Sequence, residues 1–319
     1  MAPVKSLHLR GRFWTRLHGV MATNYWESSQ CKRWLLRHSD IEAARDDDLM
    51  TMLGQRLQAR QRVIATSAVY FQRFYSKNSY ASTDPILVLV TCMYLASKVE
   101  EAPVRIRVLC AEASRMMQEL GYQELPNQIS TVAEMEFYLL EELEFDLVVF
   151  HPYDTLMSLC GACVDYIKVD ASRRSEVQAA LLQMSWYIVN DMYRSSLPLE
   201  QPPYVLAVAA LYLALVAVLP TAHEIQTLVQ STAPKDGTLV DFLAGMNVSL
   251  PIVADTVQDM LLRYDLWRQL SHTPRGGLDM LHDHAAMFQR LYHMRKAYCQ
   301  MLLTRSVVED TTDRDLRPY

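Results

Sequence analysis

An internal repeat is the feature that most constrains how this chain can fold. Residues 73–96 and 191–214 align without gaps at an offset of 118 residues. The identical pairs are Tyr75/Tyr193, Pro85/Pro203, Val90/Val208, Tyr94/Tyr212, Leu95/Leu213 and Ala96/Ala214. Further on, Phe145-Asp146-Leu147 recurs as Tyr264-Asp265-Leu266. Two copies of one structural unit therefore account for most of the chain.

Each copy holds an amphipathic segment followed by a nearly all-apolar one. Residues 60–75 carry apolar side chains at helical spacing. Asp84 is a suitable N-cap, and Pro85 fits the first helical position, where its missing N–H costs nothing. Tyr204–Leu219 is apolar throughout, but it is shorter than the roughly 20 residues of a membrane span. Because such a helix must be covered on every side, each copy is predicted to be a helical bundle with this helix at its centre.

Composition favours an all-α protein. Half of the residues are hydrophobic, whereas glycine (9) and proline (13) are scarce. Further helices are predicted at residues 46–57, 104–119, 127–144, 153–166, 176–193 and 251–270, with outer helices at 23–37 and 278–303. The predicted organisation is a basic extension (1–20), an N-terminal helix with its linker (21–45), two bundles (46–150 and 151–272), and a C-terminal helix with a tail (273–319).

Charge and motifs disfavour several functional classes. The net charge of −5 argues against a dedicated nucleic-acid binder, which usually presents a basic surface. Cys160 and Cys163 have the spacing of a metal or redox pair, but no second pair with zinc spacing accompanies them. The sequence contains no phosphate-binding loop, nucleophile elbow or arranged catalytic triad. We therefore expect a protein that is not an enzyme and that holds neither a metal nor a cofactor.

Several motifs resemble those of cyclins. Leu95–Glu101 (LASKVEE) resembles the signature of a cyclin box, and Met135-Glu136 with Phe145–Leu147 resembles the fifth helix of that box and its end. Within cyclins, Met21–Ser29 (MATNYWESS) and Val189–Arg194, followed by Pro202-Pro203, are similar to the cyclin C family. Over residues 21–272 the chain is identified as a divergent, fungal-like member of that family.

This resemblance implies two tandem cyclin-box bundles with an N-terminal helix and a C-terminal extension. It also implies a nuclear regulatory subunit, which binds and activates the Mediator-associated cyclin-dependent kinase and thereby regulates transcription by RNA polymerase II. The other subunits of the Mediator kinase module would be further partners. We expect no direct contact with nucleic acid or with a membrane.

The repeat points independently to one lysine. Lys98 aligns with Val216 in the second copy, and Glu136 aligns with Ala254 or Asp255. A lysine at the end of a buried helix is costly unless it is paired, so its presence in one copy suggests a specific role. By resemblance, Lys98 and Glu136 pair and hydrogen-bond the regulatory αC helix of the kinase, although an ordinary solvated ion pair is the alternative. The predicted kinase-binding residues are Lys98, Glu136, Glu100, Glu101, Tyr138 and Leu139.

Two further surfaces are predicted with less support from the residues alone. By resemblance, the N-terminal helix helps to select the kinase through Tyr25, Trp26 and Trp34, although these aromatic residues could equally attach the helix to the body. A groove between the boxes could receive another Mediator subunit. Its predicted residues are Trp186, Asn190, Asp191, Tyr193 and Arg194, which could instead simply cap a helix.

Two other functions compete with this interpretation. A DNA-binding general transcription factor of the TFIIB core type shares the double-box fold, but it would be expected to carry a basic surface and a zinc ribbon. Another transcriptional cyclin, with a different kinase, differs mainly in the N-terminal segment. Only the resemblance to cyclin C distinguishes this second alternative from a cyclin that binds the Mediator-associated kinase.

Overall fold

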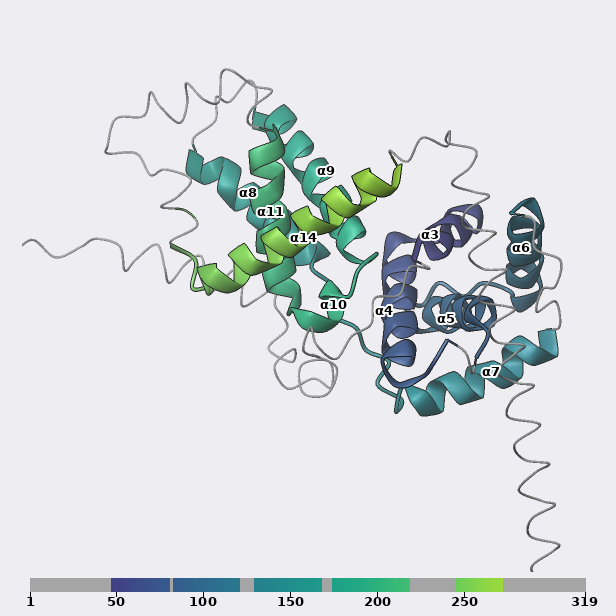
Figure 1. The fold of residues 1–319 in the computed structure, drawn as a ribbon. Helices are drawn as coiled ribbons and strands as arrows, with labels where there is room; N and C mark the ends of the chain where they lie inside the picture. Colours follow the sequence, from purple (N-terminus) through teal and green to yellow (C-terminus); the bar gives the residue numbers. More distant parts are fainter. Residues whose placement is uncertain are drawn as a thin grey trace, which may run out of the picture. The chain divides into compact units, whose positions relative to one another are not determined.

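The computed structural model describes residues 47–80, 83–120, 129–167, 174–218, 242 and 245–271, and its regular structure there is entirely helical (Figure 1). Apart from residues 47–48 and 267–271, the described chain divides into a first unit, residues 49–145, and a second unit, residues 146–266. The prediction of an all-α protein is thereby confirmed. The helices predicted at 23–37 and 278–303 lie outside the described residues.

The first unit is a bundle around one apolar helix. Its helices are α3 (Asp47–Arg56), α4 (Gln61–Lys77), α5 (Pro85–Val99), α6 (Ile106–Glu119) and α7 (Ile129–Glu142). Helix α5 lies among the others and packs against α4, α6 and α7 (Figure 1). Its apolar residues are almost all buried, as an all-round apolar helix requires. The predicted helices match these bounds within about two residues, which is the usual uncertainty of a helix end.

Helix α5 begins as the sequence predicts. The Asp84 carboxylate accepts a hydrogen bond from the backbone N–H of Ile86 at 3.0 Å, and Pro85 occupies the first helical position. The cap satisfies one of the amide groups that a helix start leaves without an intrahelical partner. This fixes where the central helix of the bundle starts and therefore where its other end lies.

Replacing Asp84 with alanine should lower the free energy of unfolding by about 1 kcal/mol, because the Ile86 amide loses its cap. Asp84→Asn is the matched control, since asparagine caps about as well as aspartate. Thermal unfolding of the three proteins would measure the effect. An alanine variant that melts together with wild type would show that the cap does not contribute.

The second unit repeats the arrangement. Its helices are α8 (Tyr153–Ile167), α9 (Arg174–Met192), α10 (Leu197–Glu200), α11 (Pro203–Val218) and α14 (Leu250–Ser271). The apolar helix α11 packs against α8 and α9, and α14 crosses them in the view of Figure 1. Helix α14 buries Val253, Val257 and Met260, which follow each other at helical spacing. The single turn α10 was not predicted, because four residues are too few to show a periodic pattern.

The repeat in the sequence is thus a repeat in the structure. The first copy supplies α4 and α5, and the second supplies α9 and α11, which place Pro85 and Pro203 at corresponding helix starts. The predicted tandem bundles are confirmed. Residues that differ between otherwise equivalent positions of the two units can therefore be compared directly.

Candidate functional site

Lys98 is the only charged residue of α5 and lies in its last turn. The part of α5 before Lys98 is buried among the other helices. The position of Lys98 at the bundle surface is therefore fixed as well. A cation at a helix C-terminus is also favoured by the helix dipole. Helix α5 is therefore a buried apolar helix that carries one ammonium group in its last turn.

The Lys98 ammonium group meets the carboxylate of Glu136 from α7. Its Nζ lies 2.6 and 2.8 Å from the two carboxylate oxygens, and 4.1 Å from the centre of the Tyr94 ring. The lysine side chain is 40% exposed, whereas that of Glu136 is 14% exposed. Burial acts to lower the pKa of Lys98, but the hydrogen bond and charge of Glu136 outweigh it and raise the pKa above its ordinary value. The Lys98 ammonium group therefore stays charged at neutral pH, and the pair reaches the surface.

The second unit lacks this pair at the corresponding place. Lys98 is replaced by Val216, which is 50% exposed, and both possible counterparts of Glu136, Ala254 and Asp255, are exposed. Tyr94 is retained as Tyr212, so the surrounding helix surface is comparable. The second unit therefore folds without this ion pair. This favours a role for Lys98 in binding over a purely structural role.

An exposed aromatic residue beside the pair was not predicted. Phe137 follows Glu136 on α7 and is 75% exposed, and Tyr138 is half-exposed with its ring 6.1 Å from that of Phe74. Leu139, by contrast, lies in the core with none of its surface exposed. This corrects the prediction for Leu139, whose place at the surface is taken by Phe137.

The spacing of apolar residues on α7 was sufficient to predict that Phe137 is exposed. Val132, Met135 and Leu139 are the buried positions of the helix. Positions three and four residues apart share a helix face, so this pattern turns Leu139 inward, places Glu136 at the edge of the buried face and leaves Phe137 outside. The prediction followed proximity to Glu136 in the sequence rather than this periodicity.

The two acidic residues after Lys98 have different surroundings. Glu100 turns toward α4, where its carboxylate accepts a hydrogen bond from the Thr66 hydroxyl at 2.7 Å and lies 3.9 Å from Arg62. Glu101 is exposed and has a left-handed backbone with φ of 52°. Glu100 thus ties α5 to α4, whereas Glu101 stands at the surface beside the end of α5.

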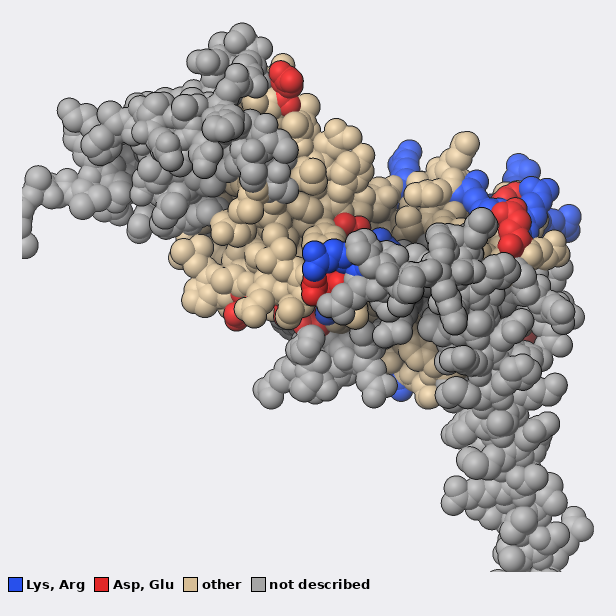
Figure 2. All heavy atoms as spheres, turned by 45° about the horizontal axis from the view of Figure 1, so that its top comes forward, with Lys and Arg blue, Asp and Glu red and all other residues tan. Residues whose placement is uncertain are grey.

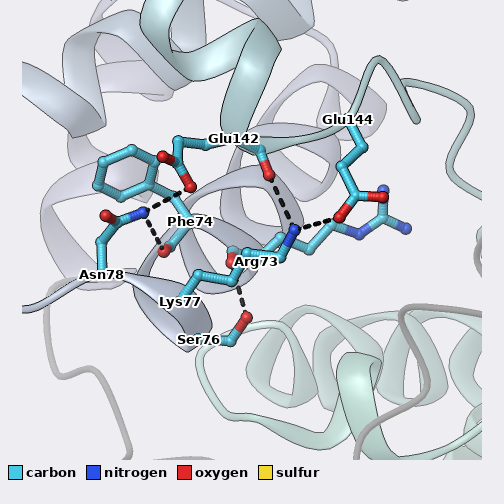
Figure 3. Close-up of polar contacts among 7 residues, drawn as sticks. All are labelled: Arg73, Phe74, Ser76, Lys77, Asn78, Glu142 and Glu144. Atoms are coloured by element: carbon cyan, nitrogen blue, oxygen red, sulfur yellow. Dashed lines mark hydrogen bonds and ion pairs between the residues drawn. The ribbon is translucent and has the colours of Figure 1, made fainter.

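The end of α7 is held by the end of α4 (Figure 3). The Lys77 ammonium group donates to the Glu142 carbonyl oxygen at 3.2 Å and to the Glu144 carboxylate at 2.6 Å. Asn78 donates through its side chain to the Glu142 carboxylate at 3.1 Å and to the Phe74 carbonyl oxygen at 3.2 Å. We call these contacts the α4–α7 joint. Phe145, directly beyond it, is 70% exposed.

The residues predicted for a second partner lie together in the second unit. Trp186 packs on Tyr153 with ring centres 4.5 Å apart, and the Tyr153 hydroxyl donates to Asn190 at 3.0 Å. Asp191 accepts a hydrogen bond from the Tyr264 hydroxyl at 2.8 Å and lies 3.6 Å from Arg194.

Tyr193 is buried, with its hydroxyl against the ring of His151. It is therefore corrected from a contact residue to an internal one, and the remaining four stay a prediction. The residues Tyr25, Trp26 and Trp34 of the predicted N-terminal helix lie outside the described residues.

The cysteine pair on α8 shows no sign of metal chemistry. Burial raises the pKa of Cys160 to about 11 and that of Cys163 to about 12, which opposes the thiolate form that binds metals. In the described part of the chain, no group of three or more His, Cys, Asp or Glu side chains could hold a metal ion. The described helices also include none that is both long and apolar enough to cross a membrane.

Charges of both signs are mixed on the described surface. On the face drawn in Figure 2, basic and acidic side chains lie beside one another, and most of the described atoms belong to other residues. In the first unit, for example, Arg56 of α3 pairs with Glu119 of α6, and Arg115 pairs with Glu112 on α6. This mixture gives no support to the DNA-binding alternative, for which a broad basic surface is expected.

Comparisons with known proteins agree with this geometry. Residues 31–148 match the family described as the N-terminal domain of cyclins. An RNA polymerase II holoenzyme cyclin-like subunit of Mycosarcoma maydis is 30% identical, over 81% of this chain and 93% of the relative. Cyclin-C of Drosophila melanogaster is 35% identical, over 78% of this chain and 91% of the relative.

A solved structure shows the same fold. A chain in the structure of the CAK complex of Chaetomium thermophilum bound to ATP-γ-S has a TM-score of 0.58, with 86% of this chain and 88% of that chain covered. At 18% identity this likeness speaks for the fold alone. With two helical bundles in tandem and two relatives aligned over more than nine tenths of their length, the chain belongs to the cyclin C family.

Proposed function

We propose that this chain binds and activates the Mediator-associated cyclin-dependent kinase in the nucleus and thereby regulates transcription by RNA polymerase II. Membership of the cyclin C family makes it a regulatory subunit of a protein kinase and not an enzyme. One observation carries the proposal: the Lys98–Glu136 pair reaches the surface beside exposed Phe137 in the first box only. The names of the relatives, cyclin-C and RNA polymerase II holoenzyme cyclin-like subunit, support the connection with transcription.

The ion pair is suited to recognise the backbone of a partner helix. A lysine ammonium group has three N–H donors, and Glu136 accepts from it with both oxygens, which leaves one donor for a carbonyl group of the partner. The carboxylate oxygens of Glu136 keep acceptor capacity for partner N–H groups. Because Glu136 already fixes the lysine, little conformational freedom is lost on binding. The pair therefore sets the register of the kinase helix.

Apolar contacts supply most of the affinity. Phe137 and Phe145 are highly exposed, and Tyr138 is half-exposed, on or directly after α7. Covering a phenylalanine side chain completely is worth about 1.5–3 kcal/mol. Such aromatic anchors dominate the energy of protein interfaces, whereas charged groups contribute more to specificity.

Activation follows from the conformations available to the kinase. A protein kinase is active only when a lysine of its β3 strand pairs with a glutamate of its αC helix. A cyclin that binds only the αC-in state shifts the population toward it, and no side chain of the cyclin needs to touch the substrate. If the free kinase populates this state at about 0.1–10%, binding raises its activity by about 10- to 1,000-fold.

The proposal is tested by co-expressing the full chain with the Mediator-type kinase of its organism, and separately with other transcriptional cyclin-dependent kinases. We expect the chain to co-purify with the Mediator-type kinase and to raise its activity on a peptide substrate by at least about tenfold. Each kinase alone is the control for basal activity. Preference for another kinase would refute the Mediator assignment, and a folded chain that binds none of them would refute the function.

A further inference from the structure

The α4–α7 joint has a role beyond holding two helices together. We propose that Lys77 is a positioning residue for kinase binding: by closing the end of α7 it fixes Phe145 in the outward direction that the kinase contacts. This inference rests on the proposed function, because the partner is the same kinase. It adds a residue of α4 to a surface otherwise built from α5 and α7.

Phe145 is presented in an unusual way. Phe137 and Phe145 are the two most exposed large hydrophobic residues in the described part of the chain. They lie eight residues apart, Phe137 on α7 and Phe145 in the left-handed turn that follows it. Phe137 directly follows Glu136, and Phe145 lies three residues beyond the end of α7, so Glu136 of the ion pair and both exposed aromatic residues belong to one short segment.

The backbone around Phe145 has to be held in place. Glu144 and Phe145 both adopt left-handed conformations, with φ of 54° and 59°. Helix ends commonly use this region, but glycine or asparagine is the usual residue there, since other side chains clash with the backbone. The turn is closed by hydrogen bonds from the Glu144 N–H to the Glu141 carbonyl at 2.9 Å and from the Phe145 N–H to the Leu140 carbonyl at 3.1 Å.

Lys77 braces this turn from outside. One ammonium group binds the carbonyl of Glu142, the last residue of α7, and the carboxylate of Glu144, within the left-handed turn. Figure 3 shows Lys77 between these two residues, with Asn78 reaching Glu142 from the other side. The lysine thus connects the helix end to the residue before Phe145. Without it, Glu144 loses this contact with α4.

The second box can be compared with the first at the residues of this turn. At an offset of 119 residues, Glu144 corresponds to Arg263 and Phe145 to Tyr264. Arg263 donates to the Ser196 hydroxyl at 2.9 Å, and Ser196 lies next to the end of α9. Both boxes therefore connect these two places of the chain, although in the second box Arg263 lies within α14 and Ser196 directly precedes α10.

The aromatic residue differs between the two joints. The Tyr264 hydroxyl donates to Asp191 at 2.8 Å, and the side chain is part-buried within α14, which continues as far as Ser271. Phe145 lacks the hydroxyl, follows the last turn of α7, and faces solvent. The fold tolerates an inward aromatic residue here, so the outward one in the first box calls for a partner.

The kinase is the occupant that these observations favour. Phe145 follows the end of α7, the helix that carries Glu136 and the exposed Phe137. This segment also carries the exposed carboxylate of Glu141, whereas that of Glu144 is paired with Lys77. The kinase segment that covers Phe145 is therefore expected to combine an apolar side chain with a neighbouring lysine or arginine.

The test measures the dissociation constant for the kinase with single and double variants of the full chain. Phe145→Ala should weaken binding by about 30-fold, the loss typical of an interface anchor. Lys77→Met should weaken it by about 3- to 5-fold. If Lys77 acts through Phe145, adding Lys77→Met to Phe145→Ala causes no further loss, and Lys77→Arg restores wild-type affinity because it can still pair with Glu144.

Two variants serve as matched controls. Arg56→Met breaks the exposed Arg56–Glu119 pair of the same unit, and Val108→Ala shortens an exposed apolar residue on α6. Both should bind the kinase as wild type does. Lys77→Met with wild-type affinity, or equal losses with and without Phe145, would overturn the proposal while binding of the wild-type chain keeps the proposed function intact. A wild-type chain that binds no kinase would defeat both.

Discussion

Kinase affinity falls by at least about 30-fold when Lys98 is replaced with glutamate. The variant places two carboxylates where an ammonium and a carboxylate were 2.6 Å apart, so both the donor to the kinase and the register of Glu136 are lost. Removing one partner of a hydrogen-bonded charge pair at an interface costs about 2–5 kcal/mol, equivalent to about 30-fold or more in the dissociation constant. Titration of the kinase with purified cyclin would measure this loss.

The double variant Lys98→Glu plus Glu136→Lys separates the two explanations of the pair. It restores an ion pair within the cyclin but exchanges its ends, so a pair that only stabilises the box would be repaired. Because the kinase meets each group from a fixed direction, we expect the double variant to bind as weakly as Lys98→Glu. Full recovery of affinity in the double variant would show that the pair is an ordinary surface ion pair that does not contact the kinase.

Either charge change should leave the fold nearly intact. The Lys98 side chain is 40% exposed, and exposed ion pairs contribute only about 0.2–1 kcal/mol. Urea unfolding of the variants should therefore differ little from that of wild type. A variant that has lost affinity but keeps its unfolding midpoint locates the effect at the interface.

Leu139→Ala should have the largest effect on stability, about 3 kcal/mol. The side chain has no exposed surface, and truncating a buried leucine removes apolar contacts and leaves a cavity. For a unit of this size, about 4–8 °C in melting temperature per kcal/mol gives a decrease of at least about 12 °C. Thermal unfolding followed by circular dichroism would measure it.

Phe137→Ala is the natural comparison, two residues away on the same helix. Its side chain is 75% exposed, so we expect a change of no more than about 0.5 kcal/mol in the free energy of unfolding. The same substitution should weaken kinase binding, which Leu139→Ala changes only through stability. If Phe137→Ala destabilised the chain as much as Leu139→Ala, α7 would be turned differently from the structure described above.

Local patterns in the sequence were sufficient to predict the fold. The Asp84-Pro85 start and the apolar run after Pro203 locate the two central helices, and helical spacing locates α6 to α9 and α14. These signals depend only on neighbours along the chain, namely caps, proline and burial of one face. The short helix α10 was missed, because one turn leaves no such pattern.

The site was only partly predictable. Lys98 stood out because the repeat offers Val216 as a control within the same sequence, and its pairing with Glu136 came from the family resemblance. The inward position of Leu139 could have been read from Val132 and Met135. The outward position of Phe145 could not, because it depends on a left-handed turn and on Lys77, more than sixty residues earlier in the chain.

The apolar surface of α5 also has a consequence for how the chain is synthesised. Helix α5 is complete at Val99, but one of the helices that cover it, α7, ends only at Glu142, about 40 residues later. At roughly 5–20 residues per second, translation leaves this helix incompletely covered for about 2–9 s. During that interval the nascent first box exposes an apolar segment at the ribosome. Chaperones that shield nascent chains, and not only the contacts of the folded state, therefore influence how much of this cyclin reaches its native state.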